Sequence, residues 1–231
     1  MTELHWKSAL YQLRSRLVSG ELVGGTKLRA SHLANDMGIS RTPIGEALIQ
    51  LEGEGLLIRD KSGFTVRSFE LEEVFDAIDL RGTLEGAALQ RAAERGVSKA
   101  ELDALYTLLA ELDRVIENGQ VDEYDQLNLD FHRQLTALSK STILIAEVER
   151  SYRLPFAGPS AFPTAKGDAK RFRASLMIGQ EHHHQIVSAL ERREGARVFA
   201  LMAEHARLAH GNVHAAVRAR GKTPQLALVN R

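Results

Sequence analysis

The chain has 231 residues, of which 44% are hydrophobic, enough for one large or two small globular domains. It has no cysteine, which excludes disulfides, thiol nucleophiles and thiolate metal sites and agrees with a reducing cytoplasm, where we expect the protein to be. No segment approaches the roughly 20 apolar residues of a membrane span, and the N-terminus lacks the apolar core of a signal peptide, so we expect a soluble protein without a membrane partner.

Charge does not by itself indicate a nucleic-acid partner, because the formal net charge is zero. Residues 1–67 carry nine Lys or Arg and seven Asp or Glu, a net charge of +2, which leaves −2 for the rest of the chain. This asymmetry is small. A prediction of DNA binding must therefore rest on local residues.

The first part of the chain has the element order of a winged helix-turn-helix. Apolar residues at helical spacing and helix-breaking glycines predict three helices, over Leu4–Val18, Ser31–Met37 and from about Ser40 to Glu54. Two short apolar runs around the polar turn 59–63 then predict a small β-hairpin. Gly38 allows the tight turn between the second and third helices, and Ser40 or Thr42 is the possible N-cap of the third.

From about residue 68 onward the pattern is helical throughout, and we expect a mostly α protein. Ser98 and Glu101 form a capping box, and the prolines at 155, 159 and 163 predict a loop over Leu154–Gly167. The predicted domains are a winged helix-turn-helix at 1–67, an all-α bundle at 68–220 and a tail at 221–231. The predicted bundle helices are Glu70–Glu94, Ser98–Asn118, Val121–Ser139, Thr142–Arg153, Lys170–Arg193 and Gly195–Ala219.

The segment Leu33–Leu56, LANDMGISRTPIGEALIQLEGEGL, is the candidate DNA-reading unit. Such a unit presents the N-terminal end of its second helix to the major groove. Arg41 could read guanine through a bidentate contact, and hydroxyl groups beside free helix N–H groups suit phosphate. A helical hairpin with a capped second helix and a solvated arginine would give the same periodicity. The candidate DNA-binding residues are Arg29, Ser40, Arg41, Thr42, Lys61 and Gly63.

The residues GISRTPIGEALIQLEGEGLL, followed by GFTV, closely resemble the GntR superfamily of bacterial regulators over Leu10–Arg67. The resemblance implies sequence-specific binding of double-stranded operator DNA by a homodimer. Gly45 departs from the family pattern, which usually has a second arginine there. The operator sequence and affinity are therefore open, and a glycine inside a helix costs about 0.8–1 kcal/mol relative to alanine.

Several of the nine histidines fall in the predicted bundle helices. Asn128 and His132 are four residues apart and therefore share a helix face, and a His-His-His triplet at 182–184 and His205 follow on later helices. Histidines from different helices can hold a divalent metal in a bundle core. Three consecutive helical histidines cannot all face one site, and His132 beside Phe131 could also be a hydrogen-bonded core residue. Spacing alone leaves these alternatives open.

A second resemblance supports the metal site. DLRGTLEGAAL, NLDFHRQL, HHQIVSAL and LMAEH are similar to segments of the FCD effector domain of the FadR subfamily. The resemblance implies Zn²⁺, Ni²⁺ or Mn²⁺ bound by His132, His183 and His205, with Asn128 where the family has aspartate. Of the three consecutive histidines, His183 is chosen because it lies three residues before Ile186, which matches the spacing of the family's His-x-x-Ile segment. Asn128 is neutral, so we expect weaker binding than with a carboxylate.

Arg81 resembles the family arginine that lines the same cavity, which implies a small organic acid as effector, held by a bidentate contact. Its alternative is an ordinary i,i+4 ion pair with Glu85. We therefore predict a DNA-binding transcription regulator that acts as a repressor, and we do not expect an enzyme. Two competing interpretations are a metal-dependent hydrolase fused to a DNA-binding domain and a regulator without metal. The absence of a paired carboxylate beside the histidines in the sequence argues against the hydrolase.

Overall fold

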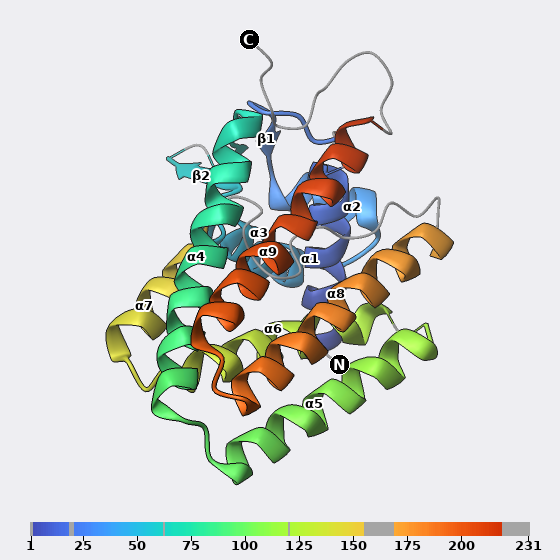
Figure 1. The fold of residues 1–231 in the computed structure, drawn as a ribbon. Helices are drawn as coiled ribbons and strands as arrows, with labels where there is room; N and C mark the ends of the chain where they lie inside the picture. Colours follow the sequence, from blue (N-terminus) through green and yellow to red (C-terminus); the bar gives the residue numbers. More distant parts are fainter. Residues whose placement is uncertain (1, 19–20, 62, 120, 155–168, 219–231) are drawn as a thin grey trace.

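The computed structural model describes residues 2–18, 21–61, 63–119, 121–154 and 169–218. Most of the predicted loop Leu154–Gly167 and the whole predicted tail 221–231 lie outside these ranges. The predicted fold class is confirmed: a winged helix-turn-helix with a small sheet precedes a bundle of helices (Figure 1). None of the described helices is long and apolar enough to cross a membrane.

The N-terminal unit contains three helices and a three-stranded antiparallel sheet in the order β1-β3-β2. Leu28 pairs with Phe64, and Leu57 pairs with Val66. The three predicted helices and the hairpin are confirmed, whereas β1 was not predicted because two residues are too short for an alternating pattern. The elements are α1 (Thr2–Val18), β1 (Lys27–Leu28), α2 (Ala30–Met37), α3 (Arg41–Gly53), β2 (Leu57–Asp60) and β3 (Gly63–Val66).

The turn between α2 and α3 follows from two residues. Gly38 is the C-cap of α2 in the left-handed conformation, with φ of 68°, which a residue with a side chain adopts only with strain. Ser40 occupies the N-cap position of α3, although its side chain makes no capping hydrogen bond, and Thr42 lies within the first turn. The apolar residues Leu33, Ile44 and Leu48 are buried where the two helices meet.

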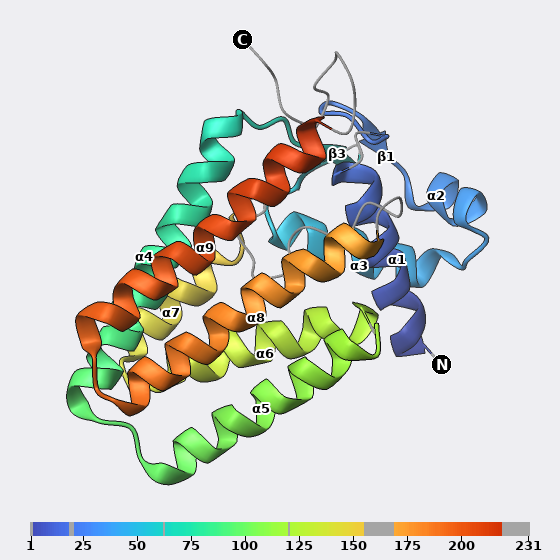
Figure 2. The same cartoon turned by 45° about the vertical axis from the view of Figure 1, so that its right-hand side comes forward.

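The C-terminal part is an all-helical bundle in which α4 and α9 lie side by side in both views (Figures 1 and 2). The six predicted helices are confirmed to within a few residues at each end. They are α4 (Leu71–Arg95), α5 (Lys99–Glu117), α6 (Val121–Ala137), α7 (Thr142–Ser151), α8 (Ala169–Glu191) and α9 (Gly195–Arg218).

The start of α5 is fixed by the predicted capping box, which is confirmed. The Glu101 N–H donates to Ser98 Oγ at 3.3 Å, and the Ser98 N–H donates to Glu101 Oε2 at 2.8 Å. Hydrogen bonds from the Ser98 backbone and side chain lower the pKa of Glu101 to about 2. The carboxylate thus stays charged and satisfies a backbone donor at the helix end.

Helices α4 and α9 approach closely because glycine and alanine face each other. A Cβ built on Gly82 would lie 2.6 Å from Ala206 Cβ, so the contact exists only with glycine at 82. Arg81 and His205, the chain neighbours of this pair, are thereby brought to the same level of the bundle.

Two hydrophobic clusters form the core. One lies within the bundle, and the other fills the winged helix-turn-helix. The second cluster also includes Val74 and Ile78 of α4 and Ala206 and Val213 of α9. The division at residues 67 and 68 stays a prediction, because side chains from both sides of it share one core.

Candidate functional site

The N-terminal end of α3 forms the candidate DNA-reading surface. Ser40, Arg41 and Thr42 are exposed there, and the first two line an open cavity of about 470 Å³ between α2 and α3. The first N–H groups of a helix have no partner within the helix and suit a phosphate oxygen. The structure therefore places these three residues together on one accessible surface, and their contacts with DNA stay a prediction.

The other predicted DNA contacts lie on different elements. Arg29 is exposed and precedes α2, at its N-cap position. Lys61 and Gly63 lie at the turn of the wing, where Gly63 has a φ of 123°. Arg59 of the wing lies over the Phe64 ring, 5.3 Å from its centroid. The wing thus carries basic residues at its turn and on β2.

Three histidines from three helices meet inside the bundle. His132 of α6, His183 of α8 and His205 of α9 each direct a ring nitrogen to a common place, with these atoms within 4.8 Å of one another. His132 and His183 are buried, and His205 is half-buried with its Nδ1 out of contact with solvent. Asn128, one turn before His132 on α6, is buried as well. The cluster of predicted ligands is therefore present, while metal binding stays a prediction.

The structure also separates the three consecutive histidines. His183 points into the cluster, whereas His184 is 42% exposed and its Nε2 lies 3.0 Å from Asp113 Oδ2 of α5. The His182 ring lies 6.0 Å from that of His205, farther than the 4.5 Å between the His183 and His205 rings. Neighbouring residues on a helix point about 100° apart, which explains this division.

Hydrogen bonds at Nδ1 determine which nitrogen of each buried ring carries the proton. His132 Nδ1 lies 3.0 Å from Glu85 Oε1, and His183 Nδ1 lies 3.0 Å from Gln180 Oε1. Gln180 uses its amide N–H groups on Leu109 O and Asp113 Oδ1, which turns its oxygen toward His183. Since both partners at Nδ1 are acceptors, Nδ1 is the donor in each hydrogen bond, and Nε2 is the nitrogen left to face a ligand.

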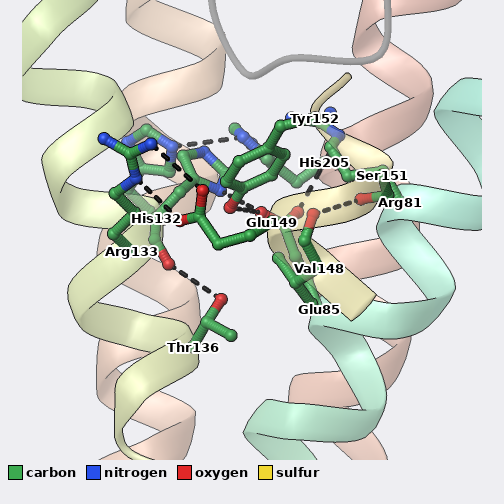
Figure 3. Close-up of polar contacts among 11 residues, drawn as sticks. Arg81, Glu85, His132, Arg133, Thr136, Val148, Glu149, Ser151, Tyr152 and His205 are labelled. Carbon is green, nitrogen blue, oxygen red and sulfur yellow. Dashed lines mark hydrogen bonds and ion pairs between the residues drawn. The ribbon is translucent and has the colours of Figure 1, made fainter. Parts of the chain in front are cut away.

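Glu85 is a carboxylate that the sequence analysis did not place at the histidine cluster, although it is single rather than paired. Its side chain is 2% exposed, and besides accepting from His132 it accepts a hydrogen bond from Tyr152 Oη at 2.6 Å (Figure 3). Burial raises the pKa of Glu85, but His132, Arg81 and the hydrogen bonds outweigh this and lower it overall. Burial and the neighbouring Glu85 raise the pKa of Tyr152 well above its ordinary value, so Tyr152 is the donor.

Arg81 forms the ion pair with Glu85 that was one of its two predicted roles, and its contact with an effector stays a prediction. Its Nε lies 3.9 Å from Glu85 Oε2, an i,i+4 ion pair that is too long for a hydrogen bond. The residue is 3% exposed, and its Nε and Nη1 have no hydrogen-bond partner among the described residues. A buried guanidinium with unsatisfied donors is costly, and an anion would satisfy them.

The cluster fits a divalent transition metal. Burial lowers the pKa of His183 and of His205 well below the ordinary value, so both rings are neutral, the form that binds metal. Their Nε2 atoms lie 3.1 Å apart, close to the about 3.0–3.4 Å between adjacent donors around an ion with bonds of about 2.0–2.1 Å. His132 Nε2 is buried without a hydrogen-bond partner in the described part of the chain. These three nitrogens, with the Asn128 amide, would hold the ion.

Comparison with known families assigns both halves of the chain. Residues 7–66 match the bacterial regulatory proteins of the gntR family, and residues 76–208, more than half of the chain, match the FCD domain. The chain belongs to the GntR family. As a GntR protein with an FCD domain, it falls among families of transcription regulators, which favours a regulator over the hydrolase alternative.

Individual relatives of this GntR protein agree with that assignment. The transcriptional regulator YdhC of Bacillus subtilis (strain 168) is 33% identical over 130 residues, 55% of this chain and 58% of that relative, so the chain spans less than two thirds of its length. The transcriptional repressor RspR of Escherichia coli (strain K12) is 27% identical over 201 residues, 84% of this chain and 82% of RspR. The solved structure of E. coli McbR/YncC has the same fold, with a TM-score of 0.62 and 22% identity over 91% of this chain and 97% of that one.

Sequence reasoning missed Glu85 as a member of the site in this GntR protein, although a signal was present. Ile78, Glu85, Leu89 and Ala92 recur at helical spacing and are buried on α4. A glutamate within an apolar face has to find a partner, because an unpaired buried carboxylate is costly. The partner that Glu85 finds, His132, is 47 residues away in the chain, so a local sequence pattern could not identify it.

Proposed function

We propose that this protein is an operator-binding repressor whose DNA affinity is controlled by a small carboxylate effector bound beside a divalent metal. In this proposal a homodimer reads a two-fold operator through Ser40, Arg41 and Thr42 of each protomer, because DNA half-sites mirror the symmetry of a dimer. The relative RspR is a transcriptional repressor, which supports repression as the direction of control.

One observation carries the effector site: the Arg81 guanidinium is buried beside the histidine cluster with two nitrogens lacking hydrogen-bond partners among the described residues. After burial and the neighbouring histidines, the charge of Arg81 also lowers the pKa of both His183 and His205. A planar guanidinium and a carboxylate form two parallel hydrogen bonds. A bound metal would supply Lewis acidity and open coordination positions for the same carboxylate.

The route to the DNA-binding domain is short. Only residues 67–70 separate β3 of the wing from α4, and α4 carries Arg81. A ligand that pulls on Arg81 would therefore shift α4 and, in a dimer, the spacing of the two α3 helices. An effector changes DNA affinity only if it binds the two arrangements differently, and we expect a coupling of about 1–3 kcal/mol.

The test begins with a thermal-shift screen of organic acids against the metal-loaded protein, because a specific ligand stabilises the folded state by mass action. An operator titration is then followed by fluorescence anisotropy with and without the acid that is found. Arg81→Ala should bind operator as the wild type does but keep it when the acid is added. Arg91→Ala, an exposed arginine on the same helix, is the matched control and should release DNA normally.

If Arg81→Ala released the operator at the same acid concentration as the wild type, Arg81 would have a structural role only. If no acid stabilised the metal-loaded protein or altered operator binding, the carboxylate effector itself would be refuted.

A further inference from the structure

The candidate metal ligands of this site include no carboxylate. His132, His183 and His205 offer ring nitrogens, and Asn128 offers an amide. A divalent cation among them, with the Arg81 guanidinium close by, would concentrate positive charge in a buried place. Charges that are removed from water require compensation by opposite charge or by hydrogen bonds. The site therefore needs a buried anion of its own.

Glu85 is placed to meet that need. It comes from α4, and its Oε1 accepts from both His132 Nδ1 and Tyr152 Oη. The second oxygen, Oε2, lies 3.9 Å from Arg81 and has no hydrogen-bond partner among the described residues. The Glu85 carboxylate is therefore hydrogen-bonded to His132 but not to Arg81. The Arg81 N–H donors stay available for another anion.

We infer that Glu85 is the positioning residue of the metal site, supplying through His132 the negative charge that the ligands themselves lack. This inference rests on the metal site of the proposed function. The Glu85 carboxylate holds the His132 ring with Nε2 toward the other two histidines and makes that nitrogen a stronger donor. Carboxylates that act on a metal through a histidine in this way typically change metal affinity by about 10–100-fold.

The experiment measures the Kd for Zn²⁺ of the purified full chain by competition with a chelating dye. Glu85→Gln keeps the shape and the hydrogen-bond acceptor but removes the charge, and should weaken Zn²⁺ binding about 10–100-fold. Glu149→Gln is the matched control, because Glu149 pairs with Arg133 on the surface and is 38% exposed. It should leave the Kd unchanged.

A charge-exchange variant provides the rescue. Asn128→Asp adds a carboxylate directly to the ligand set, so Asn128→Asp combined with Glu85→Gln should return the Kd close to that of the wild type. Co²⁺ spectra of the loaded variants report on coordination, and the double variant should show the three histidine nitrogens joined by the new carboxylate ligand. A general loss of packing from the Glu85 change would not be repaired by a new charge at 128.

Two results would overturn the inference. The first is a Glu85→Gln variant with the wild-type Zn²⁺ Kd and Co²⁺ spectrum. The second needs no variant and therefore applies even if Glu85→Gln does not fold. Nitrogen-15 NMR of the Zn²⁺-loaded wild type should show His132 protonated at Nδ1. A His132 ring coordinated to Zn²⁺ through Nδ1 would overturn the inference, because Glu85 could then not accept a hydrogen bond from that nitrogen. Failure of the metal site itself is distinct, since His132→Ala would then bind Zn²⁺ as tightly as the wild type.

Discussion

Replacing Gly82 with alanine tests how closely the two central helices approach. The added Cβ would lie 2.6 Å from Ala206 Cβ, whereas ordinary contacts begin at 3.4 Å. Ala206 Cβ is fixed to a buried backbone and cannot rotate away, so α4 and α9 would have to separate by about 1 Å.

The magnitude follows from two opposing contributions. Alanine favours a helix over glycine by about 0.8–1 kcal/mol, and overpacking a close-packed interior costs about 1–3 kcal/mol. We therefore expect Gly82→Ala to lower the free energy of unfolding by about 0–2 kcal/mol. Because Arg81 and His205 are the neighbours of the two residues in contact, Zn²⁺ affinity should fall as well.

The assay is urea denaturation of the metal-free protein, followed by circular dichroism. Gly45→Ala is the matched control, since Gly45 also lies within a helix but a Cβ there would meet nothing within 4 Å. It should raise stability by about 0.8–1 kcal/mol. Gly82→Ala with Ala206→Gly moves the methyl group from one helix to the other and should restore the wild-type value. A Gly82→Ala protein stabilised as much as Gly45→Ala would refute the close contact.

Three further predictions concern other parts of the chain. Arg41→Ala should weaken operator binding by about 1–3 kcal/mol and relax preference at one base position, measured by anisotropy with operator variants; equal weakening for all sequences would indicate a phosphate contact instead. His183→Ala should abolish stoichiometric metal in elemental analysis and His184→Ala should retain it, whereas the opposite pattern would move the site by one residue. Ser98→Ala should lower stability by about 0.5–2 kcal/mol at pH 7 in urea denaturation. The folded-state pKa of Glu101 is lowered to about 2, so its contribution to folding stability is present above about pH 4.5 and is lost as the pH falls through 2. The stability difference between wild type and Ser98→Ala should therefore shrink on acidification. A difference independent of pH would contradict the capping role of Glu101.

The helices were predictable because burial repeats along them. In α5, for example, Leu105, Leu109, Leu112 and Ile116 are buried at spacings of three and four residues, and Ser98 begins the helix with a recognisable cap. Glycines with positive φ, such as Gly38 and Gly119, then end helices where the sequence placed breaks. Each of these signals is local.

The candidate site was predictable only in part. The sequence selected His132, His183 and His205, and the structure brings them together, but the selection depended on family resemblance rather than on spacing. The contact between Glu85 and His132 joins α4 to α6 and depends on how the helices pack, which no periodicity encodes. Strand β1 was missed for a related reason, because Lys27 and Leu28 become a strand only through pairing with β3.

The hydrophobic core that the winged helix-turn-helix shares with Val74, Ile78, Ala206 and Val213 limits how modular this regulator is. A fragment cut after residue 67 would leave apolar surface open to water and would tend to aggregate, so an isolated DNA-binding domain is a poor reagent. A hybrid sensor, in which another ligand-binding bundle replaces this one, has a better prospect if the donor bundle is redesigned at those four positions. The useful junction for such a fusion therefore follows the packing of side chains rather than the order of elements along the chain.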